Sequence, residues 1–530
     1  MLVTVHPGTL ARRVLPLADV AEACLDGSGR RLFFTRMGLT VTGDNVRAYR
    51  GGAASELWCY DLTESREAVR IPFDAPMKRP MWHGDRLYVV CDRDGRDNLW
   101  SMKADGSDAR QLTFHKDWDL RGASLGEGRI VYQLGADLRA FELATGRDLP
   151  LELRLGSDED QARPRVLRRP LDYLDNAAFA LNGERVALTA RGQVLLAGLE
   201  GLRRVEVALP PASRAREAVL SRDGAWVYAL CDAGGDLQIW RFPADGRPGG
   251  EALTREPGVT RAALHPSPDG QFLAHTDRDG RVYLLKLANG ENRCIDTAPN
   301  GGSTDVAWAP DGKHLALVRP DSARSRNQIL LVRAADGHKA PLSSDKYESY
   351  APAFSPDGRW LFFLSDRHFQ ATNPSPWGDR NLGPFFDRRT QVFALALQEG
   401  LRFPFQPRTE LDVPESREAG KPEPKGKSPE PPAPVWEGLA ERLFEVPLPP
   451  GNYAGLRTDG KRLYLLDRQP QSSALKSAEI GPRPSLETFA PDVAGFELSA
   501  DGRKLMFARR GPAGRSFHIV EAGAKAPSEL

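Results

Sequence analysis

A short unit recurs along the chain and constrains the fold more than any other feature. Each copy has an Asp-Gly turn, a basic or polar residue and then a run of apolar residues. The turn supplies the positive φ that a tight hairpin needs, and the run contains the β-branched and aromatic residues typical of buried strands. The copies lie at 221–230, 267–276, 309–318, 355–364, 458–466 and 499–508, with a degenerate copy at 181–189.

The spacing of these copies predicts the architecture. From Gly183 to Gly502 the turn glycines are 41, 46, 42, 46, 102 and 42 residues apart. A period in the forties with about four strands per copy indicates β-propeller blades. Blades must stack around an axis because one blade cannot bury both of its faces. The sequence predicts seven of them, at 171–212, 213–257, 258–300, 301–344, 345–449, 450–490 and 491–527.

Two insertions account for the length of the fifth blade. Residues 366–389 include Trp377, Phe385 and Phe386, which either cover a neighbouring domain or pack on their own blade. Residues 406–436 are rich in Pro, Lys and Glu with almost nothing apolar at their centre. That composition predicts a loop.

The first part of the chain follows the same pattern more weakly. Strand-like copies at 25–36, 83–113 and 126–147 predict about three blades within residues 1–153, with residues 2–14 as the closing strand of another. Residues 154–170 have no strand pattern and are predicted to be a linker. The predicted fold class is therefore all-β, with a partial, about three-bladed propeller followed by a complete seven-bladed β-propeller at 171–530.

Charge and cysteine usage argue against several classes of protein. The chain has 530 residues, with 72 Lys and Arg against 71 Asp and Glu, and this balance argues against a nucleic-acid partner. Its five cysteines are widely spaced and form no CxxC pair, which argues against a disulfide framework or a zinc site. No apolar stretch of about 18 residues predicts a membrane span, and the first residues do not resemble a signal peptide. We therefore expect a cytoplasmic protein with no membrane partner.

No motif in the sequence meets the requirements of a catalytic site. The GxSxG at 122–126 is followed by a strand-like segment, whereas a nucleophile elbow needs a helix there. The nine histidines form no metal-spaced pair, and His275 and His314 lie within predicted strands, where packing explains them. The acid-rich turns at 92–97 and 277–280 lack the later bidentate Glu of a calcium loop. We predict no catalytic residue, no metal site and no cofactor, and hence no peptidase activity for this chain alone.

Two arginines are the candidates for a binding role. Arg168 and Arg169 stand at the junction between the two predicted propellers. A guanidinium group can grip a carboxylate with two parallel hydrogen bonds, so these side chains could guide peptide carboxylates near a propeller mouth. The alternative is that they are solvated linker charges.

Several segments resemble the tricorn protease family in its non-catalytic first half. The likeness is most specific at YESYAPAFSPDGRWLFFLSDR (347–367), followed by an insertion and RRTQVFALAL (388–397). The segment VRAYRGGAASELWCYDL (46–62) is similar to a part of the family's first propeller. The resemblance covers nearly the whole chain.

The resemblance implies a fold and a function. In that family a six-bladed propeller precedes a seven-bladed one, and a catalytic half with a PDZ domain and a Ser/His protease site follows. The enzymes trim peptides and assemble as hexamers. Residues 1–153 would then be the C-terminal blades of the six-bladed propeller, and no catalytic residue can be transferred to this sequence.

Two functions follow as alternatives. The first is the propeller portion of a tricorn-like serine peptidase, acting as a gate or channel for peptides and as an assembly scaffold, with the catalytic and PDZ half as a partner and a possible homo-oligomer. The second is a stand-alone TolB-like propeller that serves as a protein-interaction module.

Overall fold

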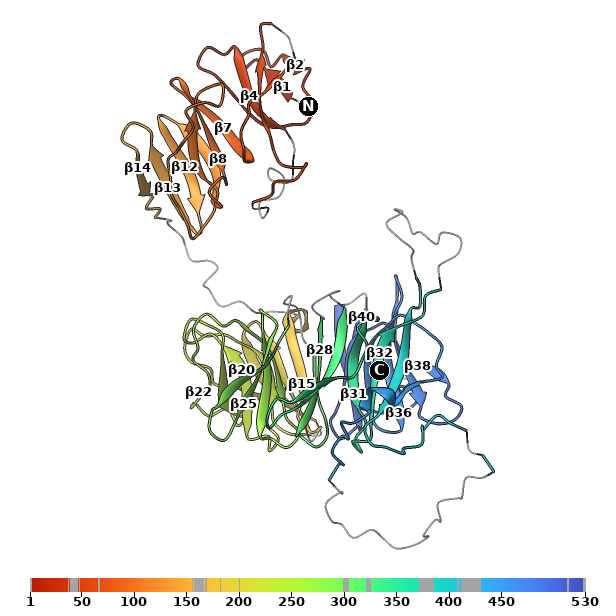
Figure 1. The fold of residues 1–530 in the computed structure, drawn as a ribbon. Coiled ribbons are helices and arrows are strands. Elements are labelled where there is room, and N and C mark those ends of the chain that lie inside the picture. The colour runs from red at the N-terminus through yellow and green to blue at the C-terminus, as the bar shows by residue number, and fades with distance from the viewer. Residues whose placement is uncertain are drawn as a thin grey trace. The chain divides into compact units, whose positions relative to one another are not determined.

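The computed structural model divides the chain into two compact units, Met1–Pro164 and Arg165–Leu530 (Figure 1). Both are built of β-sheets, and in the described part of the chain the helical elements are two 3-10 turns, η1 (Pro170–Tyr173) and η2 (Leu439–Glu441). No described helix is long and apolar enough to cross a membrane. The structure describes all residues except 1, 37, 39–45, 47, 65–66, 155, 157–165, 167–168, 182, 200, 299–304, 321–325, 371–385, 408, 411–429, 512–513 and 528–530.

The first unit contains one hairpin and three four-stranded antiparallel sheets. Residues 2–14 had been predicted as a single closing strand; instead they lie within the hairpin of β1 (Leu2–Val5) and β2 (Arg12–Leu15). The three sheets are β3 (Val20–Leu25), β4 (Arg31–Arg36), β5 (Leu57–Asp61), β6 (Val69–Arg70); β7 (Met77–His83), β8 (Arg86–Cys91), β9 (Asn98–Met102), β10 (Arg110–Gln111); and β11 (Leu120–Gly126), β12 (Arg129–Leu134), β13 (Asp137–Glu142), β14 (Arg147–Pro150).

The second unit contains seven sheets in sequence order, here called blades 1 to 7. Each is an antiparallel meander, so neighbouring strands in the sheet are also neighbours in the sequence. Blades 1 to 3 are β15 (Leu174–Phe179), β16 (Arg185–Ala190), β17 (Gln193–Gly198), β18 (Val205–Glu206); β19 (Ala215–Leu220), β20 (Trp226–Cys231), β21 (Gln238–Pro243), β22 (Glu251–Ala252); and β23 (Arg261–Pro266), β24 (Phe272–Asp277), β25 (Arg281–Lys286), β26 (Asn292–Thr297).

Blades 4 to 6 also have four strands, and blade 7 has three in the described residues. They are β27 (Asp305–Trp308), β28 (His314–Pro320), β29 (Asn327–Arg333), β30 (Lys339–Pro341); β31 (Ser349–Phe354), β32 (Trp360–Asp366), β33 (Thr390–Ala396), β34 (Leu443–Glu445); β35 (Tyr453–Thr458), β36 (Arg462–Arg468), β37 (Ser473–Glu479), β38 (Leu486–Pro491); and β39 (Val493–Leu498), β40 (Lys504–Gly511), β41 (Gly514–Glu521). The predicted partial propeller followed by a seven-bladed one is therefore confirmed.

The Asp-Gly turns join the first and second strands of the blades. In blade 2, Asp223 Oδ1 accepts hydrogen bonds from Ser221 Oγ at 2.6 Å and from the backbone N–H of Ala225 at 3.0 Å. Gly224 has φ 66°, a left-handed conformation that costs glycine little and other residues more. The turn thus depends on the short acidic side chain and on glycine together, as the sequence pattern predicted.

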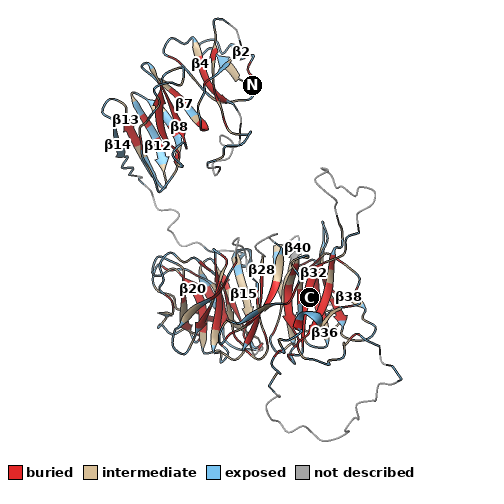
Figure 2. Cartoon of the chain, viewed as in Figure 1, coloured by how far each residue is buried: buried red, intermediate tan, exposed pale blue. Residues whose placement is uncertain are grey.

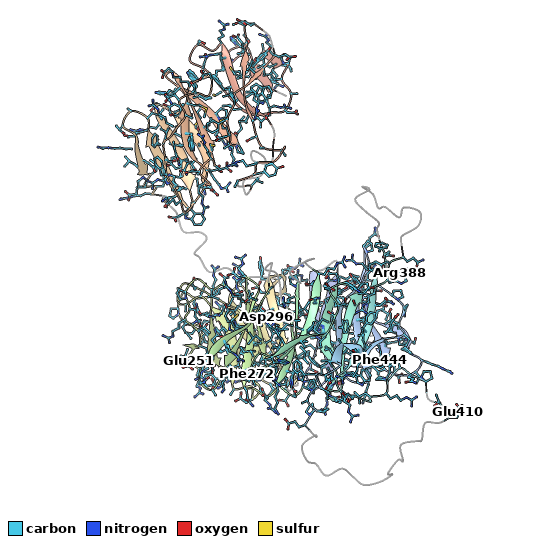
Figure 3. All side chains as sticks on the ribbon, in the orientation of Figure 1. Glu251, Phe272, Asp296, Arg388, Glu410 and Phe444 are labelled. Atoms are coloured by element: carbon cyan, nitrogen blue, oxygen red, sulfur yellow. The ribbon has the colours of Figure 1, made fainter. Side chains whose placement is uncertain are left out.

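The apolar core lies between adjacent blades, and the second strands of blades 2 to 6 are buried along most of their length (Figure 2). In blade 5 the rings of Phe363 and Phe393 stack with centroids 5.8 Å apart, and both belong to the cluster that includes Leu331 of blade 4. Blades 3 and 4 are joined by Phe272, which stacks on Trp308. Figure 3 labels Phe272 on this part of the unit. The blades are therefore held mainly by side-chain packing across their faces.

A buried carboxylate adds a polar connection between the same two blades. Asp296 on β26 is 5% exposed, and its Oδ2 lies 2.9 Å from Arg319 Nε of blade 4. Lys339, also of blade 4, pairs with Oδ1. Two cations neutralise one buried charge here, which satisfies a group that would otherwise be costly to desolvate.

The first strand of most blades carries a β-bulge. Register shifts occur between Arg216 and Val219, between Arg261 and Leu264, and at the corresponding points of β15, β31, β35 and β39. Glu217 in the bulge of blade 2 has φ 54°. Bulges bend a strand and re-aim its side chains, and here they do so where the first strands of neighbouring blades lie against each other.

The boundary between blades 7 and 1 closes the ring and is lightly packed. Its buried apolar cluster has three described members, Phe179, Val186 and Met506, against seven or more in the other clusters of this unit. The backbone N–H of Phe179 also donates to Glu497 Oε1 at 3.2 Å. Among the described residues, ring closure thus involves three buried apolar side chains, with partly buried ones packed around them, and the hydrogen bond from Phe179 to Glu497.

The two insertions are described only at their ends. Phe386 packs on Phe369 of the same insertion, with ring centroids 5.5 Å apart, and Phe369 stacks on Tyr347, which precedes β31 of blade 5. The described ends of the first insertion thus contact their own blade, close to Arg388 at one end of the unit (Figure 3). Trp377 and Phe385 lie outside the described residues. In the second insertion, Trp436 contacts His338 of blade 4 with ring centroids 4.8 Å apart.

We predict that residues 165–530 fold without the first unit. The first unit leaves apolar side chains exposed, among them Val14 (57%) and Leu149 (47%), and exposed apolar faces lower stability or favour self-association. Heating the full chain should therefore show two transitions, and residues 165–530 alone should reproduce the upper one. Hydrogen exchange that protects both units equally in a monomer, or a shortened chain that does not unfold cooperatively, would contradict this.

Candidate functional site

A cavity of about 610 Å³ lies among the first strands of the seven-bladed unit. We call it the axial cavity. Apolar residues form most of its wall, including Ala178, Leu264 and Phe496. The polar lining side chains are few, which is typical of ligand sites. They are Asp175, Asn176, Glu217, His265, Arg457, Glu497 and Arg515.

Three of these polar side chains lie at one level along the axis. In the antiparallel pairing of the first two strands, His265 is opposite Ala274, Arg457 is opposite Tyr464, and Glu497 is opposite Met506. Each of the three belongs to the second-to-last residue pair before the turn that joins the two strands. We call His265, Arg457 and Glu497 the inner tier. Residues of other blades at this level are small or apolar, such as Ala178, Val219, Ala307 and Ala353.

A second level lies two residues earlier in the strands, at or beside the β-bulges of blades 1 and 2. It contains Asn176, Glu217 and Asp305, from blades 1, 2 and 4. Asp175 lines the cavity beside Asn176. We call Asp175 and Glu217, which both line the cavity, the acidic tier. Asp305 is not among the lining residues.

Burial changes the acidity of several groups in the cavity. It raises the pKa of Glu497 to about 7, and the Phe179 N–H and Arg457 offset part of that rise. Burial also lowers the pKa of His265, with Asp305 opposing the change and Arg457 adding to it. The pKa of Glu217 is raised, first by burial and then by Asp175. Desolvation is therefore the main electrostatic effect in the cavity.

The two arginines singled out in the sequence lie elsewhere. Arg168 is outside the described residues. Arg169 precedes η1, and its Nε lies 3.0 Å from Asp172 Oδ2. It is not among the residues that line the axial cavity, so its part in guiding peptides stays a prediction.

The other motifs have structural explanations. Ser124 of the GxSxG lies on strand β11, is exposed, and is followed by strand β12. His275 is buried, and its Nε2 lies 2.8 Å from Asn292 Oδ1. His314 is also buried, with Nδ1 2.6 Å from Asp311 Oδ2. Neither histidine lines the axial cavity.

The acid-rich turns are occupied by protein groups. Asp92 Oδ2 accepts the backbone N–H of Ala48 at 2.7 Å, and Asp97 Oδ2 pairs with Lys78 Nζ at 2.7 Å. Asp277 accepts the backbone N–H of Arg281 and the hydroxyl of Tyr283. Within the described residues, no group of three or more His, Cys, Asp and Glu side chains is placed to hold a metal ion.

The charged residues of the axial cavity were not predicted from the sequence, although the sequence contains a partial signal for them. Counting five residues back from the turn glycine reaches Val219, His265 and Glu497 in blades 2, 3 and 7. The same count fails in blade 6, where it reaches Gly455 instead of Arg457. The hairpin of blade 6 is shorter, since Thr458 pairs with Leu463 whereas Leu220 pairs with Val227 in blade 2.

Comparison with known proteins identifies the family. The model of the tricorn protease second beta propeller domain matches residues 174–515, and the model of the tricorn protease N-terminal beta propeller domain matches residues 1–147. Tricorn protease homolog 1 of Streptomyces coelicolor is 29% identical over 545 residues, an alignment that covers 93% of this chain and 47% of that protein. The tricorn protease homolog of Saccharolobus solfataricus is 22% identical, over 87% of this chain and 41% of its own.

A solved structure supports the same assignment at the level of the fold. The crystal structure of the tricorn protease aligns with a TM-score of 0.60 and 19% identity, covering 95% of this chain and 47% of that one. The protein is thus a two-propeller β protein, and it belongs to the tricorn protease family. The chain spans about half the length of the curated relatives it matches.

We predict that Glu497→Gln stabilises the seven-bladed unit at high pH. The ordinary pKa of 4.5 rises to about 7 in the folded protein, so the unfolded chain releases this proton first and stability falls as pH rises between these values. The variant should gain about 2 kcal/mol at about pH 8, after allowance for solvent screening, and almost nothing at about pH 4. Denaturant unfolding at both pH values measures this.

The matched control is Glu437→Gln, an exposed carboxylate of the same unit. It should change stability equally little at both pH values. An equal gain for Glu497→Gln at the two pH values would show that its carboxylate is not desolvated.

Proposed function

We propose that this chain is the propeller portion of a tricorn-like serine peptidase and that its axial cavity admits peptides. The observation that carries the proposal is the cavity itself, whose mainly apolar wall holds a few convergent charged groups. Apolar wall surface accommodates varied side chains, while fixed charges interact with the invariant parts of a peptide. Membership of the family supplies the peptidase context.

The chain's own part in that function is non-chemical. The polar groups of the cavity come from different blades on rigid strands, an arrangement suited to selecting and orienting a ligand. Bond cleavage would belong to a catalytic half with a PDZ domain, for which the two propellers would act as scaffold in an oligomer. We place this assembly in the cytoplasm.

We predict that the full chain binds short peptides and that filling the cavity abolishes binding. Ala263 lines the cavity and comes from the bulge of blade 3. Replacing it with Trp adds a large side chain where peptides would lie, so peptide affinity should fall at least about tenfold. Isothermal titration with short synthetic peptides measures the affinity.

The control is Ala144→Trp, at an exposed turn residue of the first unit. It should leave binding unchanged. Circular dichroism and the melting temperature verify that both variants are folded. Peptide affinity that is the same in both variants would mean that peptides bind elsewhere or that the cavity serves another ligand.

A further inference from the structure

Two carboxylates and one guanidinium group lie at different levels of the axial cavity. The acidic tier contains the carboxylates of Asp175 and Glu217, whereas the inner tier contains the guanidinium of Arg457 and the imidazole of His265. Arg515 of β41 also lines the cavity. The two tiers are two residues apart along the strands, or about 7 Å at the usual rise. The carboxylates of Asp175 and Glu217 and the guanidinium of Arg457 are therefore placed to contact opposite ends of a short ligand.

The inner tier also contains a carboxylate, that of Glu497. Burial raises the pKa of Glu497 to about 7, so a large part of this side chain is neutral near that pH. Its Oε1 already accepts the backbone N–H of Phe179. Arg457 keeps its charge, since guanidinium groups stay protonated in proteins.

Several of these groups have unused hydrogen-bonding capacity among the described residues. His265 Nε2 is buried and has no hydrogen-bond partner. Arg457 donates from Nη1 to the carbonyl of Leu456, at 2.8 Å. Its other N–H groups remain available to a ligand. Buried polar groups left without a partner are costly, and a bound ligand could satisfy them.

We propose that the axial cavity binds a short peptide in one direction, with its α-ammonium group at the acidic tier and its α-carboxylate at Arg457 and His265. This rests on the proposed function and adds the part of the peptide that is recognised. Extended peptide advances about 3.3–3.6 Å per residue, so the distance between tiers matches the termini of a two- or three-residue ligand. The guanidinium can hold the carboxylate with paired hydrogen bonds.

The test uses capped peptides with the full chain. Trialanine would be titrated with both termini free, with an N-acetyl cap, and with a C-terminal amide. In the unmodified protein each cap should weaken binding about tenfold or more, because it removes one charge from a desolvated contact. In Arg457→Ala the amide cap should lose its effect while the acetyl cap keeps it. In Glu217→Gln the acetyl cap should lose most of its effect while the amide cap keeps it.

Matched variants and the comparison among peptides separate folding from recognition. Arg468→Ala and Glu437→Gln change exposed residues of the same unit and should leave both cap effects unchanged. Since each variant is compared with itself across three peptides, a loss of folded protein cannot imitate a change in one cap effect. Equal binding of all three peptides, or an amide effect that depends on Glu217 instead of Arg457, would overturn the proposed direction.

The same titrations test the proposed function separately from the direction of binding. If all peptides bind equally and Ala263→Trp still abolishes binding, peptides enter the cavity but are not held by their termini. If no peptide binds, the proposed function fails and the direction of binding fails with it.

Discussion

Seven twisted sheets that meet around one axis leave little room for side chains on their first strands. At the level of the inner tier three of the seven blades carry alanine, at Ala178, Ala307 and Ala353. Small side chains let the strands approach the axis while the blades keep their apolar contacts with each other. A large polar side chain placed on the same strands has one place to extend, which is the axial cavity. The geometry of the ring thus both creates the cavity and concentrates charge in it.

The closing of the ring is the complementary constraint. A chain that forms blades in sequence must finally join the last blade to the first, and here the described join has few buried apolar side chains. Glu497 contributes to that join and to the axial cavity, because the strand that carries it faces both. Its desolvation therefore links the electrostatics of the cavity to the stability of the ring.

The repeated turn shows how much of the fold could be predicted from sequence. Asp-Gly pairs at regular spacing gave the number of blades, because a turn with positive φ and a buried strand after it are local requirements. The spacing of the turns does not indicate Arg457, because the first hairpin of blade 6 is shorter than the first hairpins of the other blades. The sequence also drew attention to Arg168 and Arg169, which are prominent as a charged pair. Of these two, the structure describes Arg169, beside Asp172.

The sequence by itself determined that this protein is a chain of propeller blades, that the last seven form a ring, and which family it resembles. These conclusions rest on a local sequence pattern that is repeated along the chain, so a copy that departs from the pattern does not change them. The tertiary structure alone decided which side chains share the axis. His265, Arg457 and Glu497 come from three blades and are far apart in sequence. They meet because each strand's register, bulge and hairpin length set the level at which its side chains reach the cavity.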